Sequence, residues 1–363
     1  MSRIRVLVAE DSVTVRRHLC DVLQAQADIE VVAEAGDGKE AIRLCQQLRP
    51  AVVTLDMMMP VISGLGATEY IMAHCPTPIL IVSASTNRGE LFKTYEALAA
   101  GAIDVLEKPI GDDIENGWEQ RFVATVKLVS RVKPVTHPRA RLGALGQPSA
   151  WPPKPSAMPV GSPFAHGRTM VGPRRRCEVV AIGASTGGPG AILEILRALP
   201  AAFPLPILLV LHINEPFGAV FAEWLDAQTG FRVSYAKDGG LVSDLGVGRV
   251  TMAPPDAHLL VRNGRVRLTR DPARHSCRPS VDTLFDSLAI EYGAATAACL
   301  LTGMGRDGAS GLLGIRKAGG FTIAQDEATS IVYGMPREAR LLGAAERVLP
   351  LGEIAPELAA LVE

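Results

Sequence analysis

Three side chains in the second half of the chain could together carry out nucleophilic acyl transfer. Ser185 lies in a glycine-rich stretch, whereas His212 and Asp307 each follow an apolar run. A serine hydroxyl becomes a nucleophile when a histidine removes its proton, and a carboxylate can orient that imidazole and stabilise its charged form. The three residue types therefore predict an acyl-transfer site, provided that the fold brings them together.

Each of these residues also has a purely structural interpretation. Ser185 could cap a helix, His212 could end a strand, and Asp307 could form a turn. Two other histidines are rival bases, namely His258 and His275. Four other aspartates are rival third members of the site, namely Asp256, Asp271, Asp282 and Asp326. From the residues alone, these alternatives stay open.

A second group of charged residues lies in the first third of the chain. Glu10 and Asp11 follow one strand-like run, Asp56 follows another, and Lys108 follows a third. Carboxylates gathered at one sheet edge repel one another unless a cation sits among them, and Mg²⁺ prefers oxygen ligands. The pattern predicts a magnesium site.

The first domain must bring these charges together through alternating strands and helices. The expected strands are Ile4–Ala9, Ile29–Ala35, Ala51–Leu55, Ile79–Val82 and Val105–Leu106. The expected helices are Val13–Gln24, Gly38–Leu48 and Leu91–Ala99. This rhythm predicts a doubly wound α/β domain with a parallel sheet, whose ligands bind at the carboxyl ends of the strands.

The same rhythm resumes around the serine. The expected strands are Val179–Ile182, Pro206–Leu211, Val250–Ala253 and Ala295–Leu301, and Leu259–Arg262 with Arg265–Thr269 forms a hairpin. The expected helices are Ala191–Leu199, Gly218–Gln228 and Val281–Ile290. If the strands before the serine and the histidine are adjacent and parallel, both side chains emerge at one edge.

A linker separates the two halves. Between Arg131 and Arg176 the chain has nine of its 26 prolines and no Asp or Glu. The prolines favour extended polyproline geometry, and the surrounding Gly, Ser and Ala cannot supply a core. We interpret this segment as a tether between the domains. The alternative is that this basic segment docks on an acidic partner surface, with Trp151 and Phe164 as its anchors. The expected organisation is a first domain over residues 1–125, a linker over 126–178 and a second domain over 179–363.

Overall composition narrows the function classes. Lys and Arg number 37 against 38 Asp and Glu, which gives no electrostatic reason to expect a nucleic-acid partner. The chain begins without a signal-peptide pattern and has no apolar run long enough to cross a bilayer. Its six cysteines show no C-x-x-C spacing, so neither a zinc motif nor a disulfide framework is indicated. We expect a cytoplasmic protein that is not embedded in a membrane.

The first domain resembles response-regulator receiver domains. The resemblance rests on Ala9-Glu10-Asp11-Ser12, Leu55-Asp56-Met57-Met58-Met59-Pro60, Val82-Ser83-Ala84 and Gly101–Pro109. It implies a flavodoxin-like fold with a five-stranded parallel sheet and phosphorylation of Asp56 by a histidine kinase. It also implies Mg²⁺ held by Glu10, Asp11, Asp56 and the Met58 carbonyl, with Ser83 and Lys108 binding the phosphoryl oxygens.

The second domain resembles the catalytic domain of the chemotaxis protein-glutamate methylesterases. The matching stretches are Gly183–Pro189, Leu211-His212-Ile213, Arg278–Asp282 and Leu301–Ala309. The resemblance implies a mostly parallel α/β domain with a Ser185, His212 and Asp307 triad. Backbone N–H groups near Met304 and His212 would form the oxyanion hole, and Thr186 would assist.

The combined resemblance implies a phosphorylation-activated esterase that removes γ-methyl esters from glutamates on the cytoplasmic helices of chemoreceptors. It releases methanol, needs no cofactor for the esterase reaction, and is expected also to deamidate glutamines. The rival from another class is a non-catalytic two-component signalling module that binds a partner through its second domain. A DNA-binding regulator is disfavoured, because no basic helix-turn-helix pattern follows the receiver.

Overall fold

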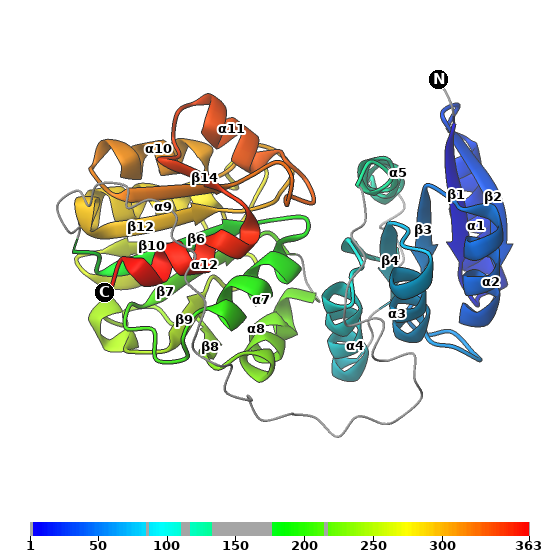
Figure 1. Cartoon of the computed structure of the whole chain (residues 1–363), viewed down its shortest axis with the longest axis horizontal. Coiled ribbons are helices and arrows are strands. Elements are labelled where there is room, and N and C mark those ends of the chain that lie inside the picture. Colours follow the sequence, from blue (N-terminus) through cyan, green and yellow to red (C-terminus); the bar gives the residue numbers. More distant parts are fainter. Residues whose placement is uncertain (1–2, 85–86, 110–116, 133–175, 214–216, 363) are drawn as a thin grey trace, which may run out of the picture.

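The computed structural model describes residues 3–84, 87–109, 117–132, 176–213 and 217–362. Within these ranges the chain forms two α/β domains that lie side by side (Figure 1). Most of the expected linker, including Trp151 and Phe164, lies outside the described residues. The exact domain boundaries stay predictions; the last helix before the linker runs to Val129, beyond the expected end of the first domain.

The N-terminal domain has a five-stranded parallel sheet in the order β2-β1-β3-β4-β5. Its strands are β1 (Ile4–Ala9), β2 (Ile29–Ala35), β3 (Val52–Leu55), β4 (Ile79–Ser83) and β5 (Asp104–Glu107). Its helices are α1 (Val13–Gln24), α2 (Gly38–Leu48), α3 (Gly64–His74), α4 (Arg88–Ala99) and α5 (Trp118–Val129). The connection from β2 to β3 crosses β1, so the carboxyl ends of β1 and β3 lie side by side at the point where such folds bind ligands.

The C-terminal domain has a seven-stranded parallel sheet in the order β14-β13-β12-β6-β7-β9-β8. The strands are β6 (Val179–Ala184), β7 (Ile207–Leu211), β8 (Arg232–Tyr235), β9 (Arg249–Met252), β12 (Thr296–Leu300), β13 (Phe321–Gln325) and β14 (Arg347–Leu349). A separate antiparallel hairpin pairs β10 (His258–Arg262) with β11 (Arg265–Thr269), as the sequence predicts. The central strands are buried along their whole length, which fits a sheet covered on both faces.

Helices cover both faces of this second sheet. They are α7 (Gly188–Ala198), α8 (Phe217–Gln228), α9 (Val281–Glu291), α10 (Ala309–Lys317), α11 (Met335–Leu341) and α12 (Leu351–Ala360). Short 3-10 turns occur at Val242–Leu245 and Gly293–Ala295. The expected helix over Ala191–Leu199 begins earlier in the structure because Pro189 enters its first turn, where a missing N–H costs no hydrogen bond.

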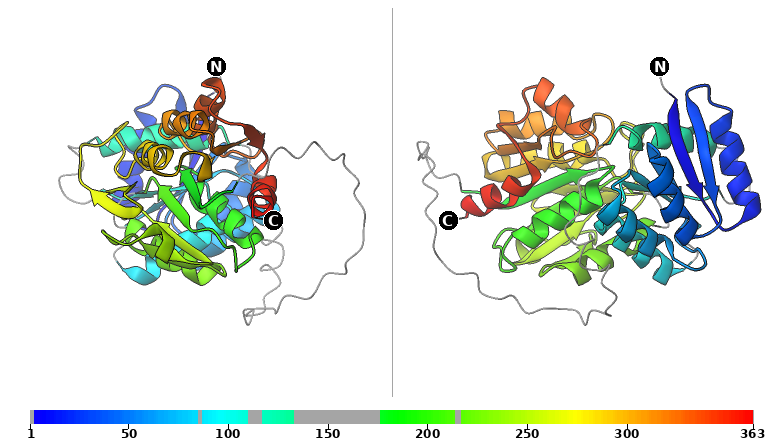
Figure 2. Two further views of the ribbon diagram at one scale, coloured as in Figure 1. Left: turned by 90° about the vertical axis from the view of Figure 1, so that its left-hand side faces the viewer. Right: turned by 45° about the vertical axis from the view of Figure 1, so that its right-hand side comes forward.

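The two domains meet through α4, which packs against α7 and α8 (Figures 1 and 2). The Tyr95 hydroxyl donates to the Phe217 carbonyl oxygen at 2.7 Å. The centroid of the Tyr95 ring lies 5.1 Å from that of Phe221 and 5.2 Å from that of Trp224. All three rings are fully or almost fully buried. Arg88 of α4 also pairs with Glu223 of α8. This contact therefore combines aromatic packing with polar pairs.

No helix in the part of the chain that the structure describes is long and apolar enough to span a membrane.

Candidate active site

Three neighbouring strands bring the predicted acyl-transfer residues to one sheet edge. β6 lies between β7 and β12 and is parallel to both. Ser185 directly follows β6, His212 directly follows β7, and Asp307 lies in the loop after β12. The condition set by the sequence, adjacent and parallel strands before the serine and the histidine, is met.

Ser185 lies in a tight connection between β6 and α7. Its backbone N–H donates to the Thr302 carbonyl at 3.0 Å, and its own carbonyl accepts from the Gly188 N–H at 2.7 Å. Gly303 faces it so closely that an added Cβ would come within 2.7 Å of the Ser185 Cβ. The serine is therefore fixed by backbone contacts beside the N-terminus of α7, where free N–H groups favour developing negative charge.

His212 and Asp307 form a hydrogen-bonded pair. The His212 Nε2 lies 2.8 Å from the Asp307 Oδ2, and the carboxylate is 2 % exposed. The same carboxylate accepts from the Ser280 hydroxyl at 2.8 Å and from the Val281 backbone N–H at 2.7 Å. These bonds fix the carboxylate, so the imidazole is held by a rigid acceptor and directs its Nδ1 away from it.

Burial and hydrogen bonding oppose each other in this pair. Burial alone would lower the pKa of His212, but the Asp307 carboxylate and the Cys277 thiol raise it to about 9. Burial alone would raise the pKa of Asp307, but the bonds from His212, Ser280 and Val281 lower it. The arrangement stabilises an imidazolium, which is the charge that a general base acquires when it takes a proton.

The rival residues of the sequence have other partners. His258 is 2 % exposed, accepts from the Ser280 N–H at 3.1 Å and lies 3.3 Å from the Pro272 carbonyl, whereas His275 pairs with Asp282 at 3.0 Å. The remaining rival aspartates bond to Arg278 (Asp256), Thr269 (Asp271) and Thr329 (Asp326). Among the described contacts of these aspartates, Asp307 alone reaches His212.

The predicted oxyanion donors are only partly available. The His212 backbone N–H donates to the Ala184 carbonyl at 3.0 Å and is thus engaged in pairing β6 with β7. Met304 is exposed in the loop that carries Asp307, and the described residues provide no protein acceptor for its N–H. The Thr186 carbonyl accepts from the Thr302 hydroxyl at 2.9 Å, which fixes the backbone beside Ser185. The structure therefore favours the Met304 N–H over that of His212 as a donor.

The charged residues of the N-terminal domain also converge. Carboxylate oxygens of Glu10, Asp11 and Asp56 lie within 4.8 Å of one another. Lys108 Nζ lies 2.8 Å from the Glu10 Oε2 and 3.1 Å from the Asp56 Oδ1. Burial raises the pKa of Asp56 and of Glu10, while burial would lower the pKa of Lys108 but both carboxylates raise it. Three carboxylates with one ammonium group fit a divalent cation.

The other residues predicted for this site lie around it. Ser83 ends β4 and is 1 % exposed, and within the described residues its hydroxyl has no hydrogen-bond partner. Met58 is 45 % exposed in the loop after β3. An added Cβ on Gly64 would come within 2.2 Å of the Asp56 carbonyl oxygen, so this glycine permits the close approach of α3 to Asp56.

Sequence reasoning missed two contacts at the acyl-transfer site. The Cys277 Sγ lies 3.7 Å from the His212 Nδ1, on the side of the ring that faces away from Asp307. From the N-terminal domain, the carboxyl group of Asp104 interacts with the side chain of Thr186, the neighbour of Ser185, and this interaction lowers the pKa of Asp104 against the effect of burial. Neither contact has a signal in the sequence, because both join residues from segments that are far apart.

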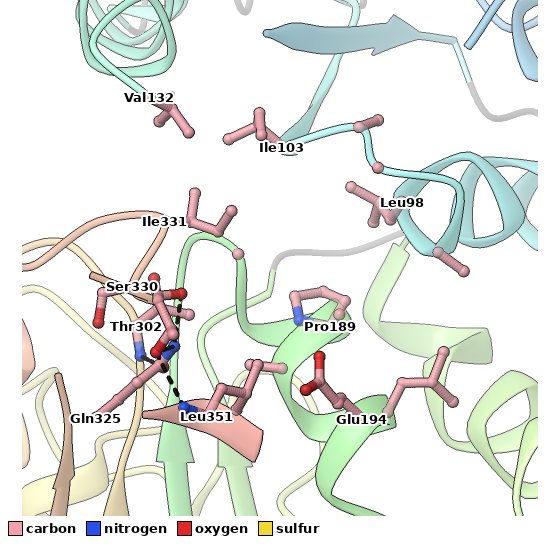
Figure 3. A pocket seen from close by; sticks show the side chains of 18 of the residues that line it. Leu98, Ile103, Val132, Pro189, Glu194, Thr302, Gln325, Ser330, Ile331 and Leu351 are labelled. Carbon is pink, nitrogen blue, oxygen red and sulfur yellow. Dashed lines mark hydrogen bonds between the residues drawn. The ribbon is translucent and has the colours of Figure 1, made fainter. Parts of the chain in front are cut away.

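A cavity of about 1030 Å³ lies where the two domains meet, close to this turn (Figure 3). Leu98, Ile103 and Val132 line it from the N-terminal domain, and Pro189 and Ile331 line it from the C-terminal domain. Its lining includes Gly187 and Thr302, which adjoin the Ser185 turn. The N-terminal domain thus approaches Ser185 from one side without filling the space between the domains.

Comparison with protein families matches both halves. Residues 6–114 match the response regulator receiver domain, and residues 180–358 match the CheB methylesterase domain. A protein-glutamate methylesterase/protein-glutamine glutaminase of Nitrosospira multiformis is 42 % identical over 99 % of this chain and 97 % of the relative. One from Methanospirillum hungatei is 39 % identical over 99 % of both chains.

Among solved structures, the CheB methylesterase catalytic domain of Thermotoga maritima is 38 % identical and covers 51 % of this chain and 98 % of that chain, with a TM-score of 0.48. The response regulator domain of Thermotoga maritima CheB is 36 % identical and covers 36 % of this chain and 99 % of that chain, with a TM-score of 0.34. Because full-length relatives match it from end to end, the chain belongs to the CheB family of protein-glutamate methylesterases, with a receiver domain in front of a methylesterase domain.

Proposed function

We propose that the chain hydrolyses glutamate γ-methyl esters on chemoreceptors, with Ser185, His212 and Asp307 as its catalytic triad. The single observation that supports the triad is the 2.8 Å hydrogen bond between His212 and Asp307. These residues follow β7 and β12, the two strands that flank β6, and Ser185 follows β6. Family membership supports the substrate, because relatives that match the whole chain are named protein-glutamate methylesterases.

The reaction follows the chemistry of a serine hydrolase. The Ser185 oxygen attacks the ester carbonyl while His212 Nδ1 takes the hydroxyl proton. His212 then gives that proton to the departing methoxide, methanol leaves, and an acyl-enzyme remains. Water, deprotonated by the same imidazole, hydrolyses the acyl-enzyme and restores Ser185. Asp307 holds the imidazole and stabilises its charge without itself becoming protonated.

The described residues record no hydrogen bond between the Ser185 hydroxyl and His212. Catalytic hydrogen bonds are often long in unliganded sites and shorten when substrate binds. In this proposal the negative charge on the tetrahedral oxygen is stabilised by the Met304 N–H and the N-terminal N–H groups of α7. The same machinery, with ammonia as the leaving group, deamidates receptor glutamines.

We propose that phosphorylation of Asp56 by a histidine kinase controls this reaction in the cytoplasm. Glu10, Asp11, Asp56 and the Met58 carbonyl would hold Mg²⁺, which supplies charge neutralisation for the transferred phosphoryl group. Lys108 neutralises further negative charge on that group. The Ser83 hydroxyl, which has no hydrogen-bond partner among the described residues, offers the group a hydrogen bond. The esterase reaction is proposed to need no cofactor of its own.

The contact between the domains suggests how the control works. Asp104 of β5 interacts with the side chain of Thr186, and α4 packs against α7, the helix that follows Ser185. We propose that this arrangement restricts the approach of a receptor helix to Ser185, and that phosphorylation weakens it. If a chain lacking residues before Val179 had the same rate constant as the unphosphorylated full chain, the restriction would be absent.

The experiment that tests the triad is methanol release from methylated receptors by Ser185→Ala protein, with a small phosphodonor present. We expect the rate to fall to background while the protein keeps its thermal unfolding transition. A normal rate would refute the role of Ser185. Labelling by a serine-directed phosphonate separates the enzyme from a non-catalytic signalling module, because an inert domain would not react at Ser185.

A further inference from the structure

Beside His212, the histidine of the proposed triad, lies a cysteine that could bind a metal ion together with it. The Cys277 Sγ lies 3.7 Å from His212 Nδ1, the ring nitrogen that Asp307 does not contact. All six cysteines lie within the described residues, and Cys277 is the one that is not buried. A partly accessible thiol thus faces the nitrogen that must accept the serine proton.

We propose that His212 Nδ1 and Cys277 Sγ form an inhibitory binding site for Zn²⁺ or a similar thiophilic divalent cation. A tetrahedral zinc ion, with Zn–N bonds of about 2.0–2.1 Å and a Zn–S bond of about 2.3 Å, separates nitrogen from sulfur by roughly 3.6 Å. The observed separation is 3.7 Å. Chelation therefore needs almost no movement of either ligand.

Asp307 completes the surroundings that a zinc-binding histidine requires. Such histidines usually donate their other ring N–H to a carboxylate, which fixes the tautomer and increases the basicity of the ligand nitrogen. Here the His212 Nε2–H donates to Asp307 at 2.8 Å, and Asp307 is itself fixed by Ser280 and Val281. The bond that serves the triad also directs Nδ1 towards the metal position.

The sulfur is held in place by a tight turn. The backbones of Arg274 and Cys277 exchange two hydrogen bonds, of 3.1 Å and 2.9 Å. His275 and Ser276 between them have φ angles of 52° and 61°, values that few residues other than glycine adopt. Since the turn fixes Cys277 in advance, little ordering is needed when the ion binds.

Nitrogen and sulfur ligands also determine which ion binds. Thiolate and imidazole favour zinc, whereas Mg²⁺ takes oxygen ligands and would remain at the carboxylates of the receiver domain. Binding replaces the thiol proton, which is released to solvent, and the ion occupies the lone pair of Nδ1. Ser185 then has no base, so hydrolysis stops. Sequence spacing gave no zinc motif because the two ligands lie on segments that only the fold brings together.

Zinc inhibition of methanol release by the full-length chain provides the first test. Each variant is normalised to its own rate after treatment with a chelator. We expect zinc, but not magnesium, to inhibit the native chain, and Cys277→Ser or Cys277→Ala to raise the half-inhibitory zinc concentration by at least about 10-fold. Cys177→Ser is the matched control, because Cys177 lies before β6, at the end of the strand opposite to Ser185.

The inhibition test rests on the proposed role of His212, so binding is measured separately. Cobalt(II) added to the full-length chain should give a thiolate-to-metal charge-transfer absorption that zinc displaces, that Cys177→Ser retains and that Cys277→Ser loses. This readout needs no esterase activity and therefore stands even if the triad assignment fails. Equal zinc sensitivity of native and Cys277→Ser chains, or a cobalt absorption unaffected by Cys277→Ser, would overturn the proposal.

Discussion

Tyr95 offers a direct test of the proposed restraint of the esterase by the receiver domain. Its hydroxyl donates to the Phe217 carbonyl at 2.7 Å across the domain contact, and its ring packs on those of Phe221 and Trp224. Tyr95→Phe removes only the hydroxyl and keeps the ring in place. The substitution therefore removes the hydrogen bond between the domains but leaves no cavity at the contact.

The magnitude follows from the burial of this bond. Tyr95 is fully buried, so the substitution leaves the Phe217 carbonyl without this donor in a place that water does not reach. Leaving one buried partner unsatisfied costs ~1–3 kcal/mol. That energy changes the ratio of the closed to the open arrangement roughly 5-fold to 150-fold. The basal rate should rise by the same factor, up to the rate of the fully open enzyme.

The measurement is methanol release from methylated receptors without a phosphodonor. Tyr70→Phe is the matched control, because it makes the same chemical change in the receiver domain at α3, where the hydroxyl contacts Gln46. With a phosphodonor, the native and Tyr95→Phe chains should converge, because phosphorylation has already opened the native chain. An unchanged basal rate in a folded Tyr95→Phe chain would refute the restraint, as would equal acceleration with and without the phosphodonor.

Three further predictions follow from single contacts. Asp307→Asn removes the acceptor that fixes His212, and we expect kcat for methanol release to fall by about 10⁴-fold, whereas a loss below tenfold would contradict the triad. Burial between the domains raises the pKa of Asp104 from 3.8 to about 6, so folding favours its protonated form. The unfolding free energy of the native chain should therefore fall, relative to Asp104→Asn, by up to about 3 kcal/mol as the pH rises from 4 to 6; parallel curves of chemical denaturation against pH would exclude this effect. Gly64→Ala, which places a Cβ 2.2 Å from the Asp56 carbonyl, should abolish phosphorylation by a small phosphodonor, whereas Gly36→Ala, whose Cβ has no neighbour closer than 3.7 Å, should not.

The sequence predicted the strands of the receiver domain closely, because each buried parallel strand is a short apolar run between turns. Two of its helices went unpredicted. α3 contains two glycines and little amphipathic pattern. By contrast, Trp118, Phe122 and Val126 recur at helical spacing, so α5 could have been predicted from a signal that was present.

The sequence also predicted which sheet edge would carry the candidate triad, since each of the three residues follows a strand. From the residues alone His258 and His275 stayed open as rivals of His212, and the structure separates the three histidines by the partners that the fold gives them. The contact between the two domains could not be predicted from the sequence either. Phe221 and Trp224 have the pattern of core residues, and nothing local indicates that part of the packing around them comes from Tyr95 of another domain.

The short strand β5 connects the contact with the C-terminal domain to the cluster of charged residues in the N-terminal domain. β5 begins at Asp104, which interacts with Thr186 of the C-terminal domain, and ends immediately before Lys108, whose Nζ lies 3.1 Å from the Oδ1 of Asp56, the proposed phosphoacceptor. At a rise of about 3.3 Å per residue, the two ends are only about 13 Å apart. In the proposed mechanism, the phosphorylation site and the contact with the esterase are therefore separated by the length of a single strand.

Because Asp104 and Lys108 lie at the two ends of β5, we expect substitutions in this strand to affect both residues. If the proposed control holds, we expect a substitution within β5 that shifts Lys108 also to shift Asp104, so that sensitivity to the kinase and basal esterase activity change together. A saturation library of β5 should yield unresponsive and constitutively active variants, with few that alter one property alone. Changes in α4 and α8 remain available for tuning the basal rate separately, because their contacts lie away from the phosphorylation site.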